Sequence, residues 1–292
     1  MAKFLFMLTK SYFYSVKLLR MYKKHLLFLL FTSLFAWKSN AQNASANIND
    51  LIQKSFTAMA NVKTMTYHFY ASERMDDGTY SKSDVEFKVV ASPLKIFANA
   101  HEPQSAKLSY DASKSKDVKV KKGLSLSLSP TNKLLMKGVH NPITRAGFGR
   151  IKMILEKSLA QRKGQDLSKY VKLAGTVMYD NKECLKVVIS DPDYKIIDYT
   201  VKPGQTNVWQ IGSDLAISEY KIKELNGIGD DVKPGQKLKI PSSYAKVTTI
   251  YFDKATNLPV FHRMEDEKGV YETYEFKNLK TGMTFTDADF QF

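Results

Sequence analysis

The sequence predicts an α+β fold, a curved antiparallel sheet packed on helices, with a small strand–helix–helix–strand module inserted into it. Many segments alternate apolar and polar residues, which is typical of strands with one buried face. Two segments instead space their apolar residues as an amphipathic helix does. Residues 199–244 contain their own turn and cap residues, and strand patterns stand on both sides of them. The order helix, strands, helix and more strands favours one sheet covered by helices.

The first half of the chain begins with a predicted helix. Asn47 is a suitable N-cap, and the apolar residues that follow it share one helical face: Ile48, Leu51, Ile52, Phe56 and Met59. A strand is predicted over residues 65–71, a hairpin turn at residues 76–78 and a return strand over residues 85–89. Further strands are predicted over residues 93–98, 106–110, 118–121 and 124–128.

The second half begins with a central helix. Asn141-Pro142 predicts its start, because proline is favoured at the first helical position. An apolar stripe continues it: Ile151, Ile154, Leu155 and Leu159. The acidic residues 265–267 are expected to form a solvated turn before Gly269. Strands are predicted over residues 171–177, 184–189, 247–252, 259–264 and 271–276.

The inserted module has a physical interpretation of its own. Residues 200–201 form a short strand that enters a Pro-Gly turn at residues 203–204. Residues 207–215 can form one helix, and Ser218 is a good N-cap for a second. The Asn-Gly pair at residues 226–227 ends that helix, because both residues tolerate the left-handed backbone conformation. A last alternating segment closes the module as a strand.

The stretch from Tyr199 to Pro241 resembles a LysM module, the small βααβ fold that binds N-acetylglucosamine glycans such as peptidoglycan or chitin. The front end departs from the family, because the usual Gly-Asp-Thr is Gly-Gln-Thr at residues 204–206 and one residue is extra before the helix. The family holds its glycan between two loops, which the resemblance places here at Gly204, Gln205, Thr206, Asn207, Gly227, Ile228, Gly229 and Asp230. The alternative is a LysM fold kept as a structural or protein-contact module.

The host sequence carries a second resemblance. Residues 250–260, 274–276 and 285–290 resemble the closing strands of LolA/LolB-type periplasmic lipoprotein carriers. Glu73-Arg74, residues 92–94 and residues 140–147 are similar to the exported family of unknown function DUF1571. A carrier-like fold implies an apolar hollow for an acyl chain, with the candidate lining residues Tyr67, Phe69, Phe87, Phe97, Leu126, Leu128, Ile151 and Leu155. The alternative is a filled core, the usual role of apolar residues at such spacing.

The first 41 residues are typical of a secretory signal peptide. Residues 21–25 are basic, residues 26–37 are apolar, and Ser39-Asn40-Ala41 carries the small residues that a signal peptidase requires. Met21 is the better start, so residues 1–20 are either an upstream mis-start or a long n-region, and we expect the mature chain to begin at Gln42. The predicted organisation is a signal peptide (1–41), a host domain (42–198 plus 245–292) and the module (199–244).

The chain carries a net charge of +15, and seven of its basic residues but no acid lie in residues 1–41. A basic envelope protein has affinity for anionic lipid head groups or wall polymers, and the alternative is an ordinary solvated surface. The single cysteine, Cys184, cannot form an internal disulfide, which favours a bacterial envelope protein over an extracellular animal one.

No catalytic or metal-binding constellation is recognisable in the sequence. The five histidines lack the spacing of a zinc hydrolase, and neither a Gly-x-Ser-x-Gly nor a Walker motif occurs. Lysines and valines alternate near residue 119, which favours a strand over a nucleic-acid patch. We therefore expect an exported, non-catalytic envelope protein that binds peptidoglycan-type glycan, without cofactor, metal or nucleic acid. The alternative is a periplasmic carrier of lipid or lipoprotein acyl chains in which the module is only structural.

Overall fold

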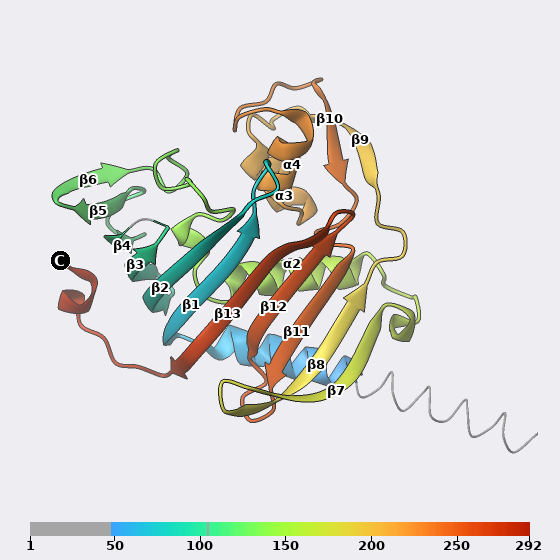
Figure 1. The fold of residues 1–292 in the computed structure, drawn as a ribbon, viewed down its shortest axis with the longest axis horizontal. Coiled ribbons are helices and arrows are strands. Elements are labelled where there is room, and N and C mark those ends of the chain that lie inside the picture. Colours follow the sequence, from blue (N-terminus) through green and yellow to red (C-terminus); the bar gives the residue numbers. More distant parts are fainter. Residues whose placement is uncertain (1–47, 104) are drawn as a thin grey trace, which may run out of the picture. The chain divides into compact units, whose positions relative to one another are not determined.

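The computed structural model describes residues 48–103 and 105–292, of which residues 50–292 form one compact unit. Its centre is an antiparallel sheet of 11 strands in the order β6-β5-β4-β3-β2-β1-β13-β12-β11-β8-β7 (Figure 1). The predicted fold class, a curved antiparallel sheet packed on helices with a βααβ module, is confirmed. The predicted signal peptide lies outside the described residues.

Each strand of the large sheet corresponds to a predicted strand. The first six are β1 (Thr64–Arg74), β2 (Tyr80–Ala91), β3 (Leu94–Glu102), β4 (Ala106–Asp111), β5 (Val118–Lys122) and β6 (Leu124–Leu128). The other five are β7 (Val171–Tyr179), β8 (Lys182–Ser190), β11 (Val247–Asp253), β12 (Pro259–Asp266) and β13 (Gly269–Thr281).

Two helices pack on one face of this sheet. They are the helix over residues 48–61 and α2 (Gly149–Ala160). The core between helices and sheet consists of Met59, Val62, Met65, Tyr67, Val89, Ile96, Ala98, Phe148, Leu258 and Phe276. Burial of this apolar surface is the main force that holds the helices to the sheet. None of the described helices is both long and apolar enough to span a membrane.

The predicted start of the central helix at Asn141-Pro142 is wrong. Pro142 precedes only a single 3₁₀ turn, Ile143–Arg145, and α2 begins at Gly149. Gly147 interrupts the helical path, because its φ of 83° lies in the left-handed region. The segment between His140 and Gly147 is therefore a loop, and it carries side chains that both candidate sites use.

The module has the predicted element order: β9 (Ile196–Thr200), α3 (Val208–Leu215), α4 (Glu219–Asn226) and β10 (Lys237–Pro241). Asn207 and Ser218 cap the two helices with their side chains, and Gly227 ends α4 in the left-handed conformation. β9 and β10 pair in a sheet of their own. The module also has its own core, formed by Val201, Val208, Ile211, Ile217, Ile222, Val232, Leu238 and Ile240.

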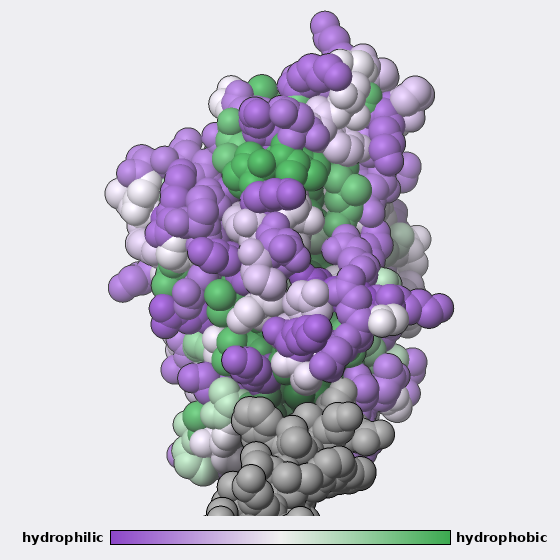
Figure 2. All heavy atoms as spheres, turned by 90° about the vertical axis from the view of Figure 1, so that its right-hand side faces the viewer, coloured by the Kyte–Doolittle hydropathy of each residue, from purple (hydrophilic) through white to green (hydrophobic). Residues whose placement is uncertain are grey.

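The strands that flank the module in sequence pair directly with each other. Ser190 at the end of β8 lies opposite Val247 at the start of β11. The backbone N–H of Asp191 donates to the carbonyl oxygen of Lys246 at 2.8 Å. The chain thus leaves the sheet after β8 and returns beside it, as an insertion requires. In Figure 1 the module lies beyond one end of the sheet, and the face shown in Figure 2 is mostly hydrophilic, with an apolar patch in its upper part.

Candidate functional site

The structure brings the two predicted glycan-binding loops side by side. The backbone N–H of Val208 donates to the carbonyl oxygen of Asp230 at 2.8 Å, and that of Val232 donates to Thr206 at 3.0 Å. Asn207 lies opposite Asp231 in an isolated antiparallel bridge. The loops therefore form one continuous edge of the module, which we call the loop edge (residues 204–207 and 227–230).

Two of the predicted glycan-binding side chains stabilise the loop edge instead of facing solvent. Gln205 is buried, and its side-chain oxygen accepts hydrogen bonds from Tyr199 Oη at 2.8 Å and from Lys202 N at 2.9 Å. Its side-chain nitrogen donates to Asp214 at 2.9 Å. Asn207 is occupied in capping α3. The glutamine that replaces the aspartate of the family's Gly-Asp-Thr thus stabilises the turn through three side-chain hydrogen bonds.

The glycines of the loop edge leave space in front of the backbone. Gly204, Gly227 and Gly229 are exposed, and a Cβ atom added to any of them would meet nothing within 4 Å. Gly204 and Gly227 have positive φ angles of 85° and 60°, whereas Gly229 does not. Gly229 is therefore the position at which a side chain can be added to the loop edge without backbone strain.

The host holds the module mainly at the C-terminal end of α3 and the N-terminal end of α4, the helix ends that lie away from the loop edge. Lys157 Nζ donates to the carbonyl oxygens of Ser213 at 2.6 Å and Asp214 at 3.0 Å. Arg150 donates to the carbonyl oxygen of Ile217 at 3.0 Å. Host side chains also reach farther along both helices: the Arg145 guanidinium lies 5.2 Å from the Trp209 ring on α3, and Lys268 Nζ donates to Glu224 on α4 at 2.7 Å. The attachment to the host leaves the loop edge uncovered.

Glu219 at the start of α4 is the centre of this attachment. It is only 1% exposed, and Arg145 donates hydrogen bonds to both of its carboxylate oxygens, at 2.8 and 2.5 Å. Arg150 lies 3.2 and 3.1 Å from the same two oxygens. Burial acts to lower the pKa of Arg145, but its hydrogen bonds and charge interaction with Glu219 outweigh burial and raise it. One buried carboxylate thus joins two host arginines to the module.

A second buried ion cluster lies beside the first. Lys221 is 1% exposed, and its Nζ donates to Asp266 and Glu267, both at 2.8 Å. Arg74 also donates to Asp266. The prediction of a solvated turn at residues 265–267 is therefore wrong for Asp266, which is buried because the module covers it. Sequence spacing gave no signal for these pairs, since their partners are far apart in the chain.

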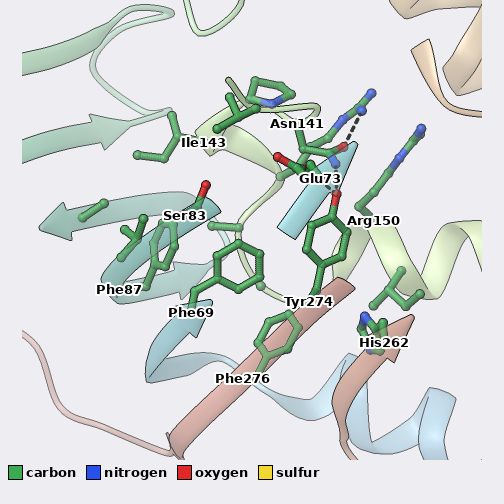
Figure 3. Close-up of a pocket in the computed structure, with 18 of the residues that line it drawn as sticks. Phe69, Glu73, Ser83, Phe87, Asn141, Ile143, Arg150, His262, Tyr274 and Phe276 are labelled. Atoms are coloured by element: carbon green, nitrogen blue, oxygen red, sulfur yellow. Dashed lines mark hydrogen bonds between the residues drawn. The ribbon is translucent and has the colours of Figure 1, made fainter. Parts of the chain in front are cut away.

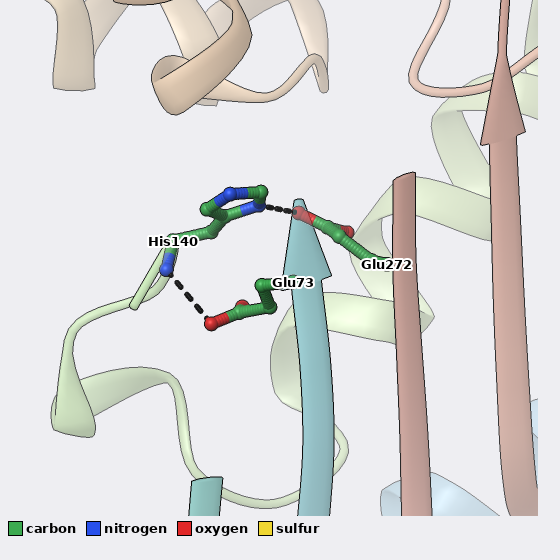
Figure 4. Close-up of side chains that lie close together, drawn as sticks. All are labelled: Glu73, His140 and Glu272. Atoms are coloured by element: carbon green, nitrogen blue, oxygen red, sulfur yellow. Dashed lines mark hydrogen bonds and ion pairs between the residues drawn. The ribbon is translucent and has the colours of Figure 1, made fainter. Parts of the chain in front are cut away.

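Glu73, His140 and Glu272 form a third buried cluster, with ligand-type atoms within 4.8 Å of one another (Figure 4). His140 Nδ1 lies 2.7 Å from Glu272 Oε1, and Nε2 lies 3.0 Å from the carbonyl oxygen of Arg74. A carbonyl only accepts, so Nε2 carries a proton. Burial acts to lower the pKa of His140, but the charges of Glu73 and Glu272 outweigh it and raise the pKa.

The remaining carboxylate oxygens of this cluster are also engaged. Tyr274 Oη donates to Glu73 Oε1 at 2.5 Å, and the His140 backbone N–H donates to Glu73 Oε2 at 3.1 Å. Tyr244 Oη donates to Glu272 Oε2 at 2.9 Å. Both ring nitrogens of His140 face oxygen atoms of the protein, so neither offers a free lone pair to a metal. The geometry is therefore that of a hydrogen-bonded ion cluster that fixes the 140–147 loop.

The host contains a cavity of about 500 Å³ between the sheet, the 140–147 loop and α2 (Figure 3). Aromatic side chains dominate its centre, where the Tyr67 ring lies 5.0 Å from Phe87 and 5.1 Å from Phe276. Phe69 stacks on Tyr274 at 5.5 Å. Arg145 and Arg150, which hold Glu219, also line the cavity. The module and the cavity thus share two arginines.

Seven of the eight residues predicted for an apolar hollow line this cavity: Tyr67, Phe69, Phe87, Leu126, Leu128, Ile151 and Leu155. Phe97 does not. Its β3 neighbours Ala98 and Ala100 face the cavity, so Phe97 points to the other face of the sheet, where its ring lies 6.5 Å from that of Phe292. Phe97 was chosen from the sequence because it is aromatic. Successive residues of a strand point to opposite faces, so Phe97 points away from the side on which Ile96 and Ala98 lie.

His262 is the polar residue of the cavity that sequence analysis missed. It is 2% exposed, and Nε2 has no hydrogen-bond partner among the described residues. Its ring packs 5.4 Å from Phe276. Burial lowers the pKa of His262 to about 3, so the imidazole is neutral at physiological pH. An unpaired nitrogen beside an apolar cavity is unfavourable unless a ligand or a water molecule supplies its partner.

The LysM domain family matches residues 199–241. The comparison with curated proteins gives no match. Among solved structures, the Pseudomonas aeruginosa MucA/MucB complex aligns over 85% of this chain and 60% of that chain, at 12% identity and a TM-score of 0.39. The Mycobacterium tuberculosis lipoprotein LppX aligns over 82% of this chain and 97% of that chain, at 14% identity and a TM-score of 0.38.

A LolA superfamily protein from Nitrosomonas europaea aligns over 83% of this chain and 96% of that chain, at 8% identity and a TM-score of 0.32. The chain spans 58–62% of the length of the MucB chains it matches. The resemblance to DUF1571 stays a prediction. Residues 199–241 are similar to LysM domains, in agreement with the resemblance found in the sequence.

Proposed function

We propose that this protein is exported to the cell envelope, where its module binds peptidoglycan-type N-acetylglucosamine glycan without catalysis. The LysM match over residues 199–241 carries the proposal. The loop edge supports it, because its two loops are joined by backbone hydrogen bonds and its glycines are exposed. Glycines allow a sugar to approach backbone amides and carbonyls closely. Gly204, Gly227 and Gly229 stay exposed beside the host contacts, so a glycan has access to the loop edge.

Gly229→Trp is expected to weaken the binding of N-acetylglucosamine oligomers at least tenfold, measured by isothermal titration calorimetry. The indole would occupy the space in front of the loop edge, which is open around Gly229, and exclude the sugar sterically. Gly227→Trp is a poorer probe, because the φ of Gly227 is 60° and the substitution would strain the α4 C-cap.

Gly149→Trp is the matched control. Gly149 is also exposed, has open space before its Cα and has no positive φ, but it lies in the host at the start of α2. It should bind the oligomers as the unmodified protein does. Equal binding by the Gly229 and Gly149 variants would contradict the assignment of the loop edge.

The second candidate function is transport of a lipid or lipoprotein acyl chain. The cavity favours it, because a volume of about 500 Å³ falls in the range of small-molecule sites and its centre is aromatic. His262 and Arg150 each have a buried nitrogen without a hydrogen-bond partner among the described residues. Both line the cavity, so a ligand head group could pair with them.

Ala100→Phe is expected to reduce co-purifying lipid roughly tenfold or more, since each excluded CH₂ group forfeits about 0.8 kcal/mol. Ala100 lines the cavity, and a phenyl ring there would fill part of it. The readout is mass spectrometry of organic extracts. Asn99→Phe is the control, because Asn99 lies between two cavity-facing alanines and points to the other face of β3. Lipid retained in full by the Ala100 variant, or absent from the unmodified protein, would contradict this candidate.

A further inference from the structure

Three exposed leucines lie on β6 and in the segment that follows it, at one end of the large sheet. Leu124, Leu126 and Leu134 are 82%, 52% and 61% exposed. Exposed large apolar side chains elsewhere in residues 48–103 and 105–292 are Tyr80, Leu173, Met178 and Met283, which do not adjoin one another in sequence. We call the three leucines the leucine lip. An apolar cluster at the surface marks a place where the protein meets an apolar partner.

The leucine lip is continuous with the cavity. Leu126 and Leu134 both line it, and so does Val120, which pairs with Leu126 across the β5–β6 hairpin. β6 is the last strand of the sheet and has a free edge (Figure 1). The lip therefore borders the opening through which an apolar ligand would enter or leave.

Several lysines lie close in sequence to the leucine lip. Lys121 and Lys122 precede the hairpin turn, and Lys133 and Lys137 flank Leu134 in sequence. All four are exposed, and none forms an ion pair with another described residue. Lys122 pairs with Leu124 and shares its face, whereas Lys121 faces the other side of the hairpin, where its Nζ lies 5.9 Å from the Phe292 ring. Residues 116–137 contain six lysines and a single acidic residue, Asp117. Leucines within a basic rim complement a surface with anionic head groups over hydrocarbon.

We propose that the leucine lip and its lysines dock onto an anionic lipid bilayer, with the β5–β6 hairpin entering the interface edge first. The leucines would enter the acyl boundary while the lysines contact head groups. A second copy of the chain is a poorer occupant, because antiparallel pairing of two β6 edges would bring two basic hairpins together. The proposal goes beyond glycan binding and does not require the cavity to hold lipid.

The test is co-sedimentation of the chain from Gln42 onward with vesicles of phosphatidylglycerol and phosphatidylethanolamine, compared with phosphatidylcholine vesicles. Binding to the anionic vesicles that weakens with salt is expected. Leu124→Asp/Leu134→Asp should abolish binding to them, and Lys121→Glu/Lys122→Glu should weaken it roughly tenfold or more. All of these side chains are exposed, so circular dichroism should show intact folds.

Met178→Asp is the matched control, because Met178 is 71% exposed but lies on β7, the last strand at the other end of the sheet. It should bind vesicles as the unmodified protein does. No binding of the unmodified protein to anionic vesicles, or equal loss in the Met178 variant, would overturn the proposal. The proposal would also be overturned if the unmodified protein did not bind vesicles but formed a dimer in solution, and if Leu124→Asp/Leu134→Asp dissociated that dimer. Glycan titration of the same samples reports separately on the module.

Discussion

Glu219→Ala is expected to lower the free energy of unfolding by about 3–5 kcal/mol, measured by urea denaturation at pH 7. The carboxylate is 1% exposed and pairs with Arg145 and Arg150. Its removal leaves two guanidinium groups at the module–host contact without their anion. Loss of one partner from a buried pair costs far more than loss of a surface pair, because the remaining charge is still desolvated.

Glu156→Ala is the control for this experiment. Glu156 pairs with Lys152 at 2.5 Å on the surface of α2 and is 45% exposed. Its removal should change stability by less than about 0.5 kcal/mol. Gly212→Ala should resemble Glu219→Ala, because the added Cβ would lie 2.3 Å from the Glu219 carboxyl carbon. A loss below 1 kcal/mol for Glu219→Ala would show that the module is not held by this carboxylate.

His262→Phe is expected to reduce the loss of unfolding free energy between pH 7 and pH 5 by about 2 kcal/mol. Burial depresses the folded-state pKa of His262 to about 3 from its usual 6.5. A depressed pKa means that the unfolded chain binds the proton more readily, so stability present above pH 6.5 is lost as the pH falls toward 3. Phenylalanine cannot take up the proton and also removes the unpaired Nε2.

The measurement is the unfolding free energy at pH 7 and pH 5 for both proteins. His140 acts in the opposite direction, because its raised pKa contributes stability below the unfolded value of 6.5 that is lost at higher pH. It cannot account for a loss on acidification. His101→Phe is the control, since His101 is exposed. An equal acid response of His262→Phe and the unmodified protein would contradict the burial of a neutral, unpaired imidazole.

Local signals predicted the module well. Ser218 and Gly227 act as the N-cap and the C-cap that the sequence indicates. The hydrophobic alternation of the host likewise predicted its strands. These features depend on residues close in the chain, and caps and strand periods act over a few residues.

The buried charges could not be predicted in the same way. Glu219 and Lys221 stand on a short helix where charged residues are normally solvated, and Asp266 stands in an acidic turn. They are buried because the module packs on the host, and apart from the Lys221–Glu224 pair their partners are 45 or more residues away. The partner of His140, Glu272, is 132 residues away. Only the tertiary arrangement determines which charges lose water.

Retention of the chain from Gln42 onward on purified peptidoglycan, with soluble N-acetylglucosamine oligomers as competitor, tests the proposed glycan binding most directly. The protein should be retained and released by the competitor. The Ala100→Phe variant should be retained equally, because Ala100 lines the host cavity and is not part of the loop edge. The Gly229→Trp variant should not be retained on the peptidoglycan. Failure of the unmodified protein to be retained, or full retention of folded Gly229→Trp, would contradict glycan binding at the loop edge.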